Sequence, residues 1–122
     1  LSPDTQRDME LLSEALNPPF GFIDVPKEEE IVAPGATGIG WALDDSGVES
    51  VLVSFDGGPA TPATYGLSHP GPARVYPNYP DSKSAAFVFP IPILPSGSHV
   101  LAVTIVAKDR GQERLLRRFQ VR

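Results

Sequence analysis

Three tyrosines stand in one proline-rich stretch of the chain, between residues 65 and 82. A tyrosine combines a flat apolar face with a hydroxyl group, and such faces stack on sugar rings or on the side chains of a protein partner. Polar residues of the same stretch would add hydrogen bonds to a ligand held in this way. The candidate ligand-binding residues are therefore Tyr65, His69, Tyr76, Tyr79, Asp81 and Ser82. The structural alternative, which we favour, is that the tyrosines pack this loop onto the rest of the domain.

Five aspartates fall at the ends of expected strands and invite a calcium hypothesis, because Ca²⁺ takes several carboxylate and carbonyl oxygens that converge at short range. They are Asp24, Asp44, Asp45, Asp56 and Asp109. Their spacing fits no calcium-binding loop. Three of them stand in or near glycine turns, where an aspartate commonly bonds its own backbone, and we expect Asp24 and Asp44 to be buried and to anchor a backbone amide. The sequence thus predicts no metal site.

Nucleophilic catalysis would need a serine or cysteine with a base and an orienting acid within hydrogen-bond reach. The chain has no cysteine, and its two histidines are His69, in the long loop, and His99, which we expect to bond across a hairpin. The sequence contains none of the local motifs of serine hydrolases, zinc proteases or phosphate-binding loops. We therefore expect a protein without catalytic residues and without a cofactor.

Alternating apolar residues predict about seven short strands, and the turns between them are rich in glycine, proline and aspartate. The strands are expected near residues 20–25, 38–43, 51–55, 63–66, 85–93, 100–107 and 114–122, with Ile31 and Val32 as a short continuation of the first strand. The 63–66 strand is expected to return antiparallel to 51–55, and residues 67–84 form a long loop. Residues 2–16 predict a short helix, ended by Asn17-Pro18-Pro19. The fold class is an all-β, immunoglobulin-like antiparallel sandwich with a short N-terminal helix.

The alternation also assigns faces to the strands. Trp41 is expected to point inward together with Ile39 and Leu43, opposite Gly38, Gly40 and Ala42. A second inward face is expected to consist of Phe87, Phe89, Ile91 and Ile93. Pro90 and Pro92 cannot donate to a ladder, so that strand should lie at an edge or be partly unpaired. In the last strand Arg117 falls on the core side, which a bulge near Leu115-Leu116 would explain.

The net charge of −5 conceals a basic end, because six of the ten cationic residues lie in the last fifteen positions. We expect these side chains to meet the acidic segment Glu28-Glu29-Glu30 and to discourage edge-to-edge pairing. One basic strand in an acidic chain lacks the broad footprint of a nucleic-acid binder. The chain also has no apolar run long enough to span a membrane, so neither nucleic acid nor membrane is an expected partner of this segment.

Several short motifs follow one another in an order that resembles a bacterial immunoglobulin-like domain. They are Gly21 to Pro26, Gly40 to Asp44 with Gly47-Val48, Asp56-Gly57, Tyr65-Gly66, Tyr76-Pro77, Pro80-Asp81-Ser82, Gly97 to His99 and Asp109 to Gly111. The resemblance covers residues 20–122. It departs at His69, where an arginine is expected before proline, and at Gly71-Pro72, where an acidic pair usually begins a helix.

The resemblance implies an accessory domain of a larger envelope-associated or secreted protein. Residues 1–19 would then be a helical connector with a proline linker, and residues 20–122 the sandwich domain. The expected function is a non-catalytic module for spacing, display or protein interaction at an extracytoplasmic location, periplasmic or on the cell surface. Its expected partners are other domains of the same polypeptide or a cell-envelope protein. The alternative is a carbohydrate-binding module that holds a glycan with the tyrosine-rich loop 65–82.

Overall fold

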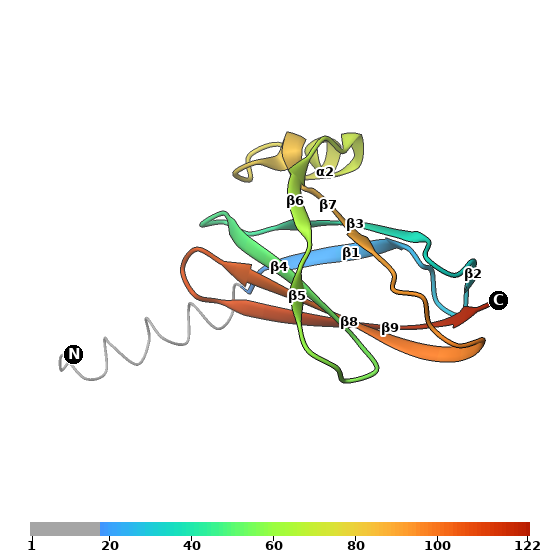
Figure 1. The fold of residues 1–122 in the computed structure, drawn as a ribbon. Coiled ribbons are helices and arrows are strands. Elements are labelled where there is room, and N and C mark those ends of the chain that lie inside the picture. The colour runs from blue at the N-terminus through green and yellow to red at the C-terminus, as the bar shows by residue number, and fades with distance from the viewer. Residues whose placement is uncertain (1–17) are drawn as a thin grey trace.

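The computed structural model describes residues 18–122, which form two sheets packed face to face (Figure 1). The first sheet contains, in spatial order, β1 (Phe20–Val25), β3 (Thr37–Leu43), β7 (Ala86–Pro90) and β6 (Thr64–Leu67). The second contains β2 (Ile31–Val32), β9 (Gln112–Val121), β8 (Gly97–Ala107), β4 (Val48–Phe55) and β5 (Thr61–Pro62). The expected helix at residues 2–16 lies outside the described residues. Within residues 18–122, no helix has the length and apolar character that crossing a membrane would require.

The all-β sandwich is confirmed, but the described strands number nine rather than about seven. The two additional strands are two residues long. β2 contains Ile31 and Val32, which were expected only as a short continuation of the first strand, and β5 is too short for an alternating pattern to reveal it. The expected strand at 63–66 is also paired differently. β5 pairs with β4, whereas β6 crosses to the other sheet and pairs with β7. The rule that consecutive strands form hairpins would keep both β5 and β6 beside β4. In the structure, β6 instead forms the edge of the first sheet beside β7.

The core lies between the sheets and consists of apolar side chains that alternate along the strands. Leu101, Val103 and Ile105 of β8 are all fully buried, as the sequence predicts. β7 is also paired as its prolines require, because β6 contacts only its first residues and the end near Pro90 bonds β3 alone. Ile93 was wrongly placed in the core and is 84% exposed. β7 ends at Pro90, and strand alternation no longer governs the chain beyond that residue.

The face assigned to β3 was also wrong. Gly38, Gly40 and Ala42 point into the sandwich, and Trp41 lies on the outer face. A Cβ on Gly38 would lie 2.1 Å from the Phe89 ring, and one on Gly40 would lie 2.4 Å from the Phe87 ring. Two phenyl rings therefore fill the space that the glycines leave open. Ile39 and Trp41 are displaced outward because the volume of β7 is already on the inside, whereas Leu43 is fully buried.

Arg117 keeps its inward position without the expected bulge, since β8 and β9 pair without a register shift from Gly97–Val121 to Val106–Gln112. Its guanidinium lies over Phe22 of β1 instead, with the Cζ atom 5.4 Å from the centre of the ring and Nη1 donating to the Pro26 carbonyl at 3.3 Å. The Arg117 side chain is only 14% exposed, so its charge is held by protein groups rather than by open solvent. The expected ion pairs with the acidic segment are present, between Arg117 and Glu28 and between Arg118 and Glu29.

Candidate binding surface

The tyrosine-rich segment folds over the outer face of the first sheet, where Figure 1 shows α2 (Pro70–Val75) and the 3₁₀ helix η1 (Ser82–Ser84) beyond β3 and β7. His69 caps α2: its Nδ1 accepts a hydrogen bond from the Gly71 amide at 3.0 Å, and Pro70 occupies the first helical position. The Nε2 atom of the same ring lies 3.1 Å from Oδ2 of Asp24 on β1. His69 thus joins the loop to the sheet, and the helix begins without the acidic pair that related domains would use.

Tyr76 and Tyr79 form an aromatic cluster with Phe20 and Trp41. The Phe20 ring centre lies 4.9 Å from that of Tyr76 and 5.4 Å from that of Tyr79, and the two tyrosine rings are 5.6 Å apart, all in edge-to-face geometry. Such pairs stabilise by about 0.5–1.5 kcal/mol each beyond the apolar area they bury. All four residues are half-buried. The cluster therefore holds the loop on the sheet and leaves only part of each ring for a ligand.

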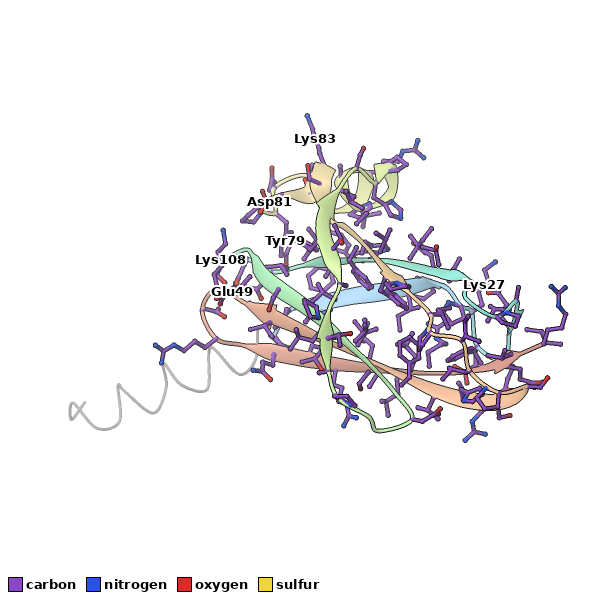
Figure 2. All side chains as sticks on the ribbon, in the orientation of Figure 1. Lys27, Glu49, Tyr79, Asp81, Lys83 and Lys108 are labelled. Atoms are coloured by element: carbon purple, nitrogen blue, oxygen red, sulfur yellow. The ribbon has the colours of Figure 1, made fainter. Side chains whose placement is uncertain are left out.

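The other predicted binding residues do not join this cluster. The Tyr65 side chain bonds the Ala42 carbonyl through its hydroxyl at 2.8 Å, and burial raises the pKa of Tyr65 to about 12, with a contribution from the charge of Asp81. Ser82 is buried within the loop, and Asp81 is exposed with a positive φ of 61°. Figure 2 shows Tyr79 on the strand side of the loop, with Asp81 and Lys83 farther out. The six residues therefore divide between loop packing, a sheet contact and open surface.

Two apolar features escaped the sequence analysis. Phe22 is 48% exposed and pairs in register with Trp41, so the two side chains share the outer face of the first sheet. The sequence could have indicated this face, because Phe20 and Phe22 are two residues apart and therefore lie on the same side of β1. At one edge of the sandwich, a groove of about 390 Å³ is lined by Phe55, Gly58, Pro59, Thr61, Pro90, Pro92 and Leu94. Its lining comes from two turns distant in sequence, so no local pattern marks it.

His99 was expected to bond across a hairpin, but it bonds Asp56, which follows β4, and Pro95, which precedes its own strand β8. Its Nδ1 lies 2.6 Å from Oδ2 of Asp56, and its Nε2 lies 2.6 Å from the Pro95 carbonyl oxygen. Because both neighbours are acceptors, the geometry suits a ring protonated on both nitrogens. The bonds to Pro95 and Asp56 raise the pKa of His99. Burial acts to raise the pKa of Asp56, but the Val100 amide and His99 outweigh it and hold that pKa below its usual value.

Of the remaining aspartates, Asp24 contacts a histidine, whereas Asp44 and Asp109 accept hydrogen bonds from backbone amides. Asp24 contacts His69 rather than a backbone amide, and it is only half-buried. Asp44 is 1% exposed and anchors the Ser46 amide at 2.8 Å, as predicted. Asp109 accepts from the Gly111 amide at 2.9 Å, which is the turn role expected of it. The fold also brings carboxylate oxygens of Asp44, Asp45 and Asp109 within 4.8 Å of one another, which the spacing of these residues did not suggest.

No protein-family model and no curated protein sequence matches this chain. Among solved structures, dimeric latent PorU from Porphyromonas gingivalis matches 91% of this chain with 11% of its own, at 17% identity and a TM-score of 0.66. The endo-beta-1,4-mannanase from Thermotoga petrophila matches 99% of this chain with 24% of its own, at 13% identity and a TM-score of 0.62. The fibronectin(III)-like modules of Clostridium thermocellum CbhA match 87% of this chain with 47% of theirs, at 14% identity and a TM-score of 0.58.

At these identities the likeness is one of fold. It confirms the immunoglobulin-like sandwich, and the similar structures include fibronectin(III)-like modules and parts of larger proteins, in agreement with the resemblance to bacterial immunoglobulin-like domains. This chain spans less than half of the length of each of the three matched chains.

Proposed function

We propose that this chain is a non-catalytic accessory module that spaces, displays or connects other parts of a larger extracytoplasmic protein. The observation that supports this most directly is the apolar filling of the interior between the two sheets, with Asp44 and Ser82 as the only buried polar side chains among the described residues. The polar groups near both histidines are engaged in local hydrogen bonds. A sandwich built in this way offers rigid length and surface rather than a reaction chamber.

The similar structures support the same proposal, because this chain matches only a part of each of them. Nearly the whole of this chain matches a minor part of PorU and of the mannanase. Domains that recur inside larger chains and keep their own core commonly act as independent units. The partners of this module would then be neighbouring domains of its own polypeptide or a protein of the cell envelope.

A domain replacement in the parent polypeptide tests the proposal. Residues 20–122 would be replaced by an unrelated sandwich of similar length, and by a short flexible linker as the matched control. A spacing role predicts that the unrelated sandwich preserves the function of the parent and that the flexible linker reduces it. A display or interaction role predicts that both replacements lose partner binding. Detection of a chemical step catalysed by the purified 122-residue chain would contradict the proposal outright.

A second candidate is carbohydrate binding, which the aromatic outer face favours. Phe22 and Trp41 pair in register on this face, and Phe20 packs against both Trp41 and Tyr79. Stacked aromatic faces suit sugar rings. Trp41 is the only tryptophan of the chain, so its fluorescence reports directly on this face. Titration with a panel of neutral oligosaccharides should change the emission of the wild type and of Leu116→Ala, a control on the other sheet, but not of Tyr79→Ala. Unchanged emission at millimolar sugar would exclude this candidate.

A further inference from the structure

Two turns that lie far apart in the sequence meet at one end of the sandwich. The β3–β4 turn precedes Val48, and the β8–β9 turn follows Ala107; because Val48 pairs with Ala107, both turns lie at the same end of the sandwich. The Asp109 amide donates to Ser46 Oγ at 3.2 Å across 63 residues of sequence, and the Lys108 amide donates to the Gly47 carbonyl at 2.9 Å. These contacts fix the two turns against each other. Figure 2 marks this end of the molecule by Lys108 and Glu49.

Three aspartates converge at this junction: Asp44 and Asp45 from the first turn and Asp109 from the second. One carboxylate oxygen of each lies within 4.8 Å of the others. Ca²⁺ binds oxygen at about 2.3–2.6 Å, so two ligands on opposite sides of one ion are about 4.8 Å apart. The spacing of the three groups therefore matches a shared Ca²⁺. None of the three acids forms an ion pair within residues 18–122.

A second observation comes from Asp44 itself. Its side chain is 1% exposed; Oδ2 accepts from the Ser46 amide at 2.8 Å and the Ser46 hydroxyl at 2.5 Å, while Oδ1 is buried and has no hydrogen-bond partner in the described part of the chain. A buried carboxylate oxygen without a partner is costly, and such groups in native proteins usually meet a donor, a water or an ion. Asp44 thus contributes to the group of three acids a buried carboxylate that has one oxygen without a partner.

The three carboxylates lie close enough to repel one another. A divalent cation would remove the repulsion that these three carboxylates exert on one another. The sequence argued against calcium because the spacing of the five aspartates fits no calcium-binding loop and because turn chemistry accounts for them. Spacing along the chain does not show that the folded sandwich brings Asp109 beside Asp44 and Asp45.

We propose that Asp44, Asp45 and Asp109 bind one Ca²⁺ ion at the junction of the β3–β4 and β8–β9 turns. Backbone carbonyls and water would complete its shell of six to eight oxygens. Ca²⁺ fits better than Mg²⁺, since Mg²⁺ demands a near-ideal octahedron and gives up its waters reluctantly. Pro19 lies beside Gly111 in the second turn, so the ion would sit where the chain enters the sandwich.

Terbium luminescence and thermal unfolding of the 122-residue chain test this proposal. Tb³⁺ replaces Ca²⁺ at oxygen sites, and Trp41, three residues before Asp44 and about 10 Å away along the strand, would transfer excitation energy to it. We expect Tb³⁺ emission in the wild type that Ca²⁺ displaces. Roughly 10 mM Ca²⁺ should raise Tm by about 4–10 °C if the dissociation constant is ~10⁻⁴–10⁻³ M, as in extracellular modules, and Mg²⁺ should raise it less.

Asp109→Asn is the informative variant, because an asparagine keeps the side-chain oxygen that caps the Gly111 amide and the exposed turn should still fold. It should lose the sensitised emission and the rise in Tm. Asp81→Asn, an exposed aspartate outside the cluster, is the matched control and should behave as the wild type. Absence of any Ca²⁺ effect in the wild type, or an equal effect in Asp109→Asn, would overturn the proposal and leave a buried water as the partner of Asp44.

Discussion

Replacing Gly38 by alanine tests which face of β3 points into the sandwich. A Cβ at residue 38 would lie 2.1 Å from the Phe89 ring, about 1.3 Å closer than the 3.4 Å at which ordinary contact begins. The Phe89 ring is 1% exposed, and its centre lies 6.0 Å from that of Phe87 and 6.3 Å from that of Phe55. The ring cannot move aside without displacing its neighbours, so the added methyl group must strain the core.

The expected cost follows from two opposing effects. A change from glycine to alanine stabilises a protein by about 0.4–1 kcal/mol where the backbone accepts it, because the unfolded chain loses freedom. Overpacking a well-filled core costs about 1–3 kcal/mol, and more where the neighbours cannot shift. The overlap at Gly38 is large, so we expect the free energy of unfolding to fall by about 2–3 kcal/mol, which corresponds to a decrease in Tm of roughly 10 °C for a chain of this length.

Urea denaturation followed by Trp41 fluorescence and by circular dichroism measures this change. Ile39→Ala is the matched control, because Ile39 neighbours Gly38 on the opposite face and is 37% exposed; it should cost about 1 kcal/mol or less. Phe89→Leu removes the ring that meets the new methyl group, so the double variant should lose less stability than the two single losses added together. A neutral Gly38→Ala, or an Ile39→Ala that is the more damaging of the two, would refute the outward placement of Trp41.

Three further outcomes are expected from the same measurements. His99→Gln should lower stability by about 1 kcal/mol, allowing for the partial exposure of Asp56, between about pH 4 and 6.5, and the difference should vanish at higher pH. The sign follows from two pKa shifts. Folding raises the pKa of His99, so its contribution to stability is complete below the pKa of the unfolded state and is lost as the pH rises through the pKa of the folded state. Folding lowers the pKa of Asp56, so its contribution to stability is lost only at acid pH. Tyr65→Phe should cost about 0.5–1.5 kcal/mol through its hydroxyl bond to the β3 backbone, with Tyr65→Leu costing clearly more. Tyr76→Ala should release the loop, shift the emission of Trp41 to longer wavelength and cost about 2 kcal/mol, and unchanged emission would contradict the packing role of the ring.

The strands that sequence predicted best are those whose pattern is local and uninterrupted. β8 alternates apolar residues for its whole length, and each predicted inward side chain from Leu101 to Ala107 is buried. The packing role of Tyr76 and Tyr79 was also foreseen, because a loop so rich in proline needs side chains to order it. The two-residue strand β5 was missed, since two residues establish no period. Ile31 and Val32 were expected to continue the first strand, but as β2 they pair with β9 of the other sheet.

Composition and periodicity by themselves determined that this chain is an all-β sandwich with glycine- and proline-rich turns, because backbone geometry imposes a period of two on every strand. They also determined that β3 alternates, but not which of its faces is inward. That choice depended on the Phe87 and Phe89 rings of a strand far along the chain, which occupy the space above Gly38 and Gly40. The meeting of Asp44 with Asp109 is of the same kind. At such positions the packing of side chains and the repulsion of charges depend on segments far apart in the sequence. Only the tertiary structure sets the distances between those segments.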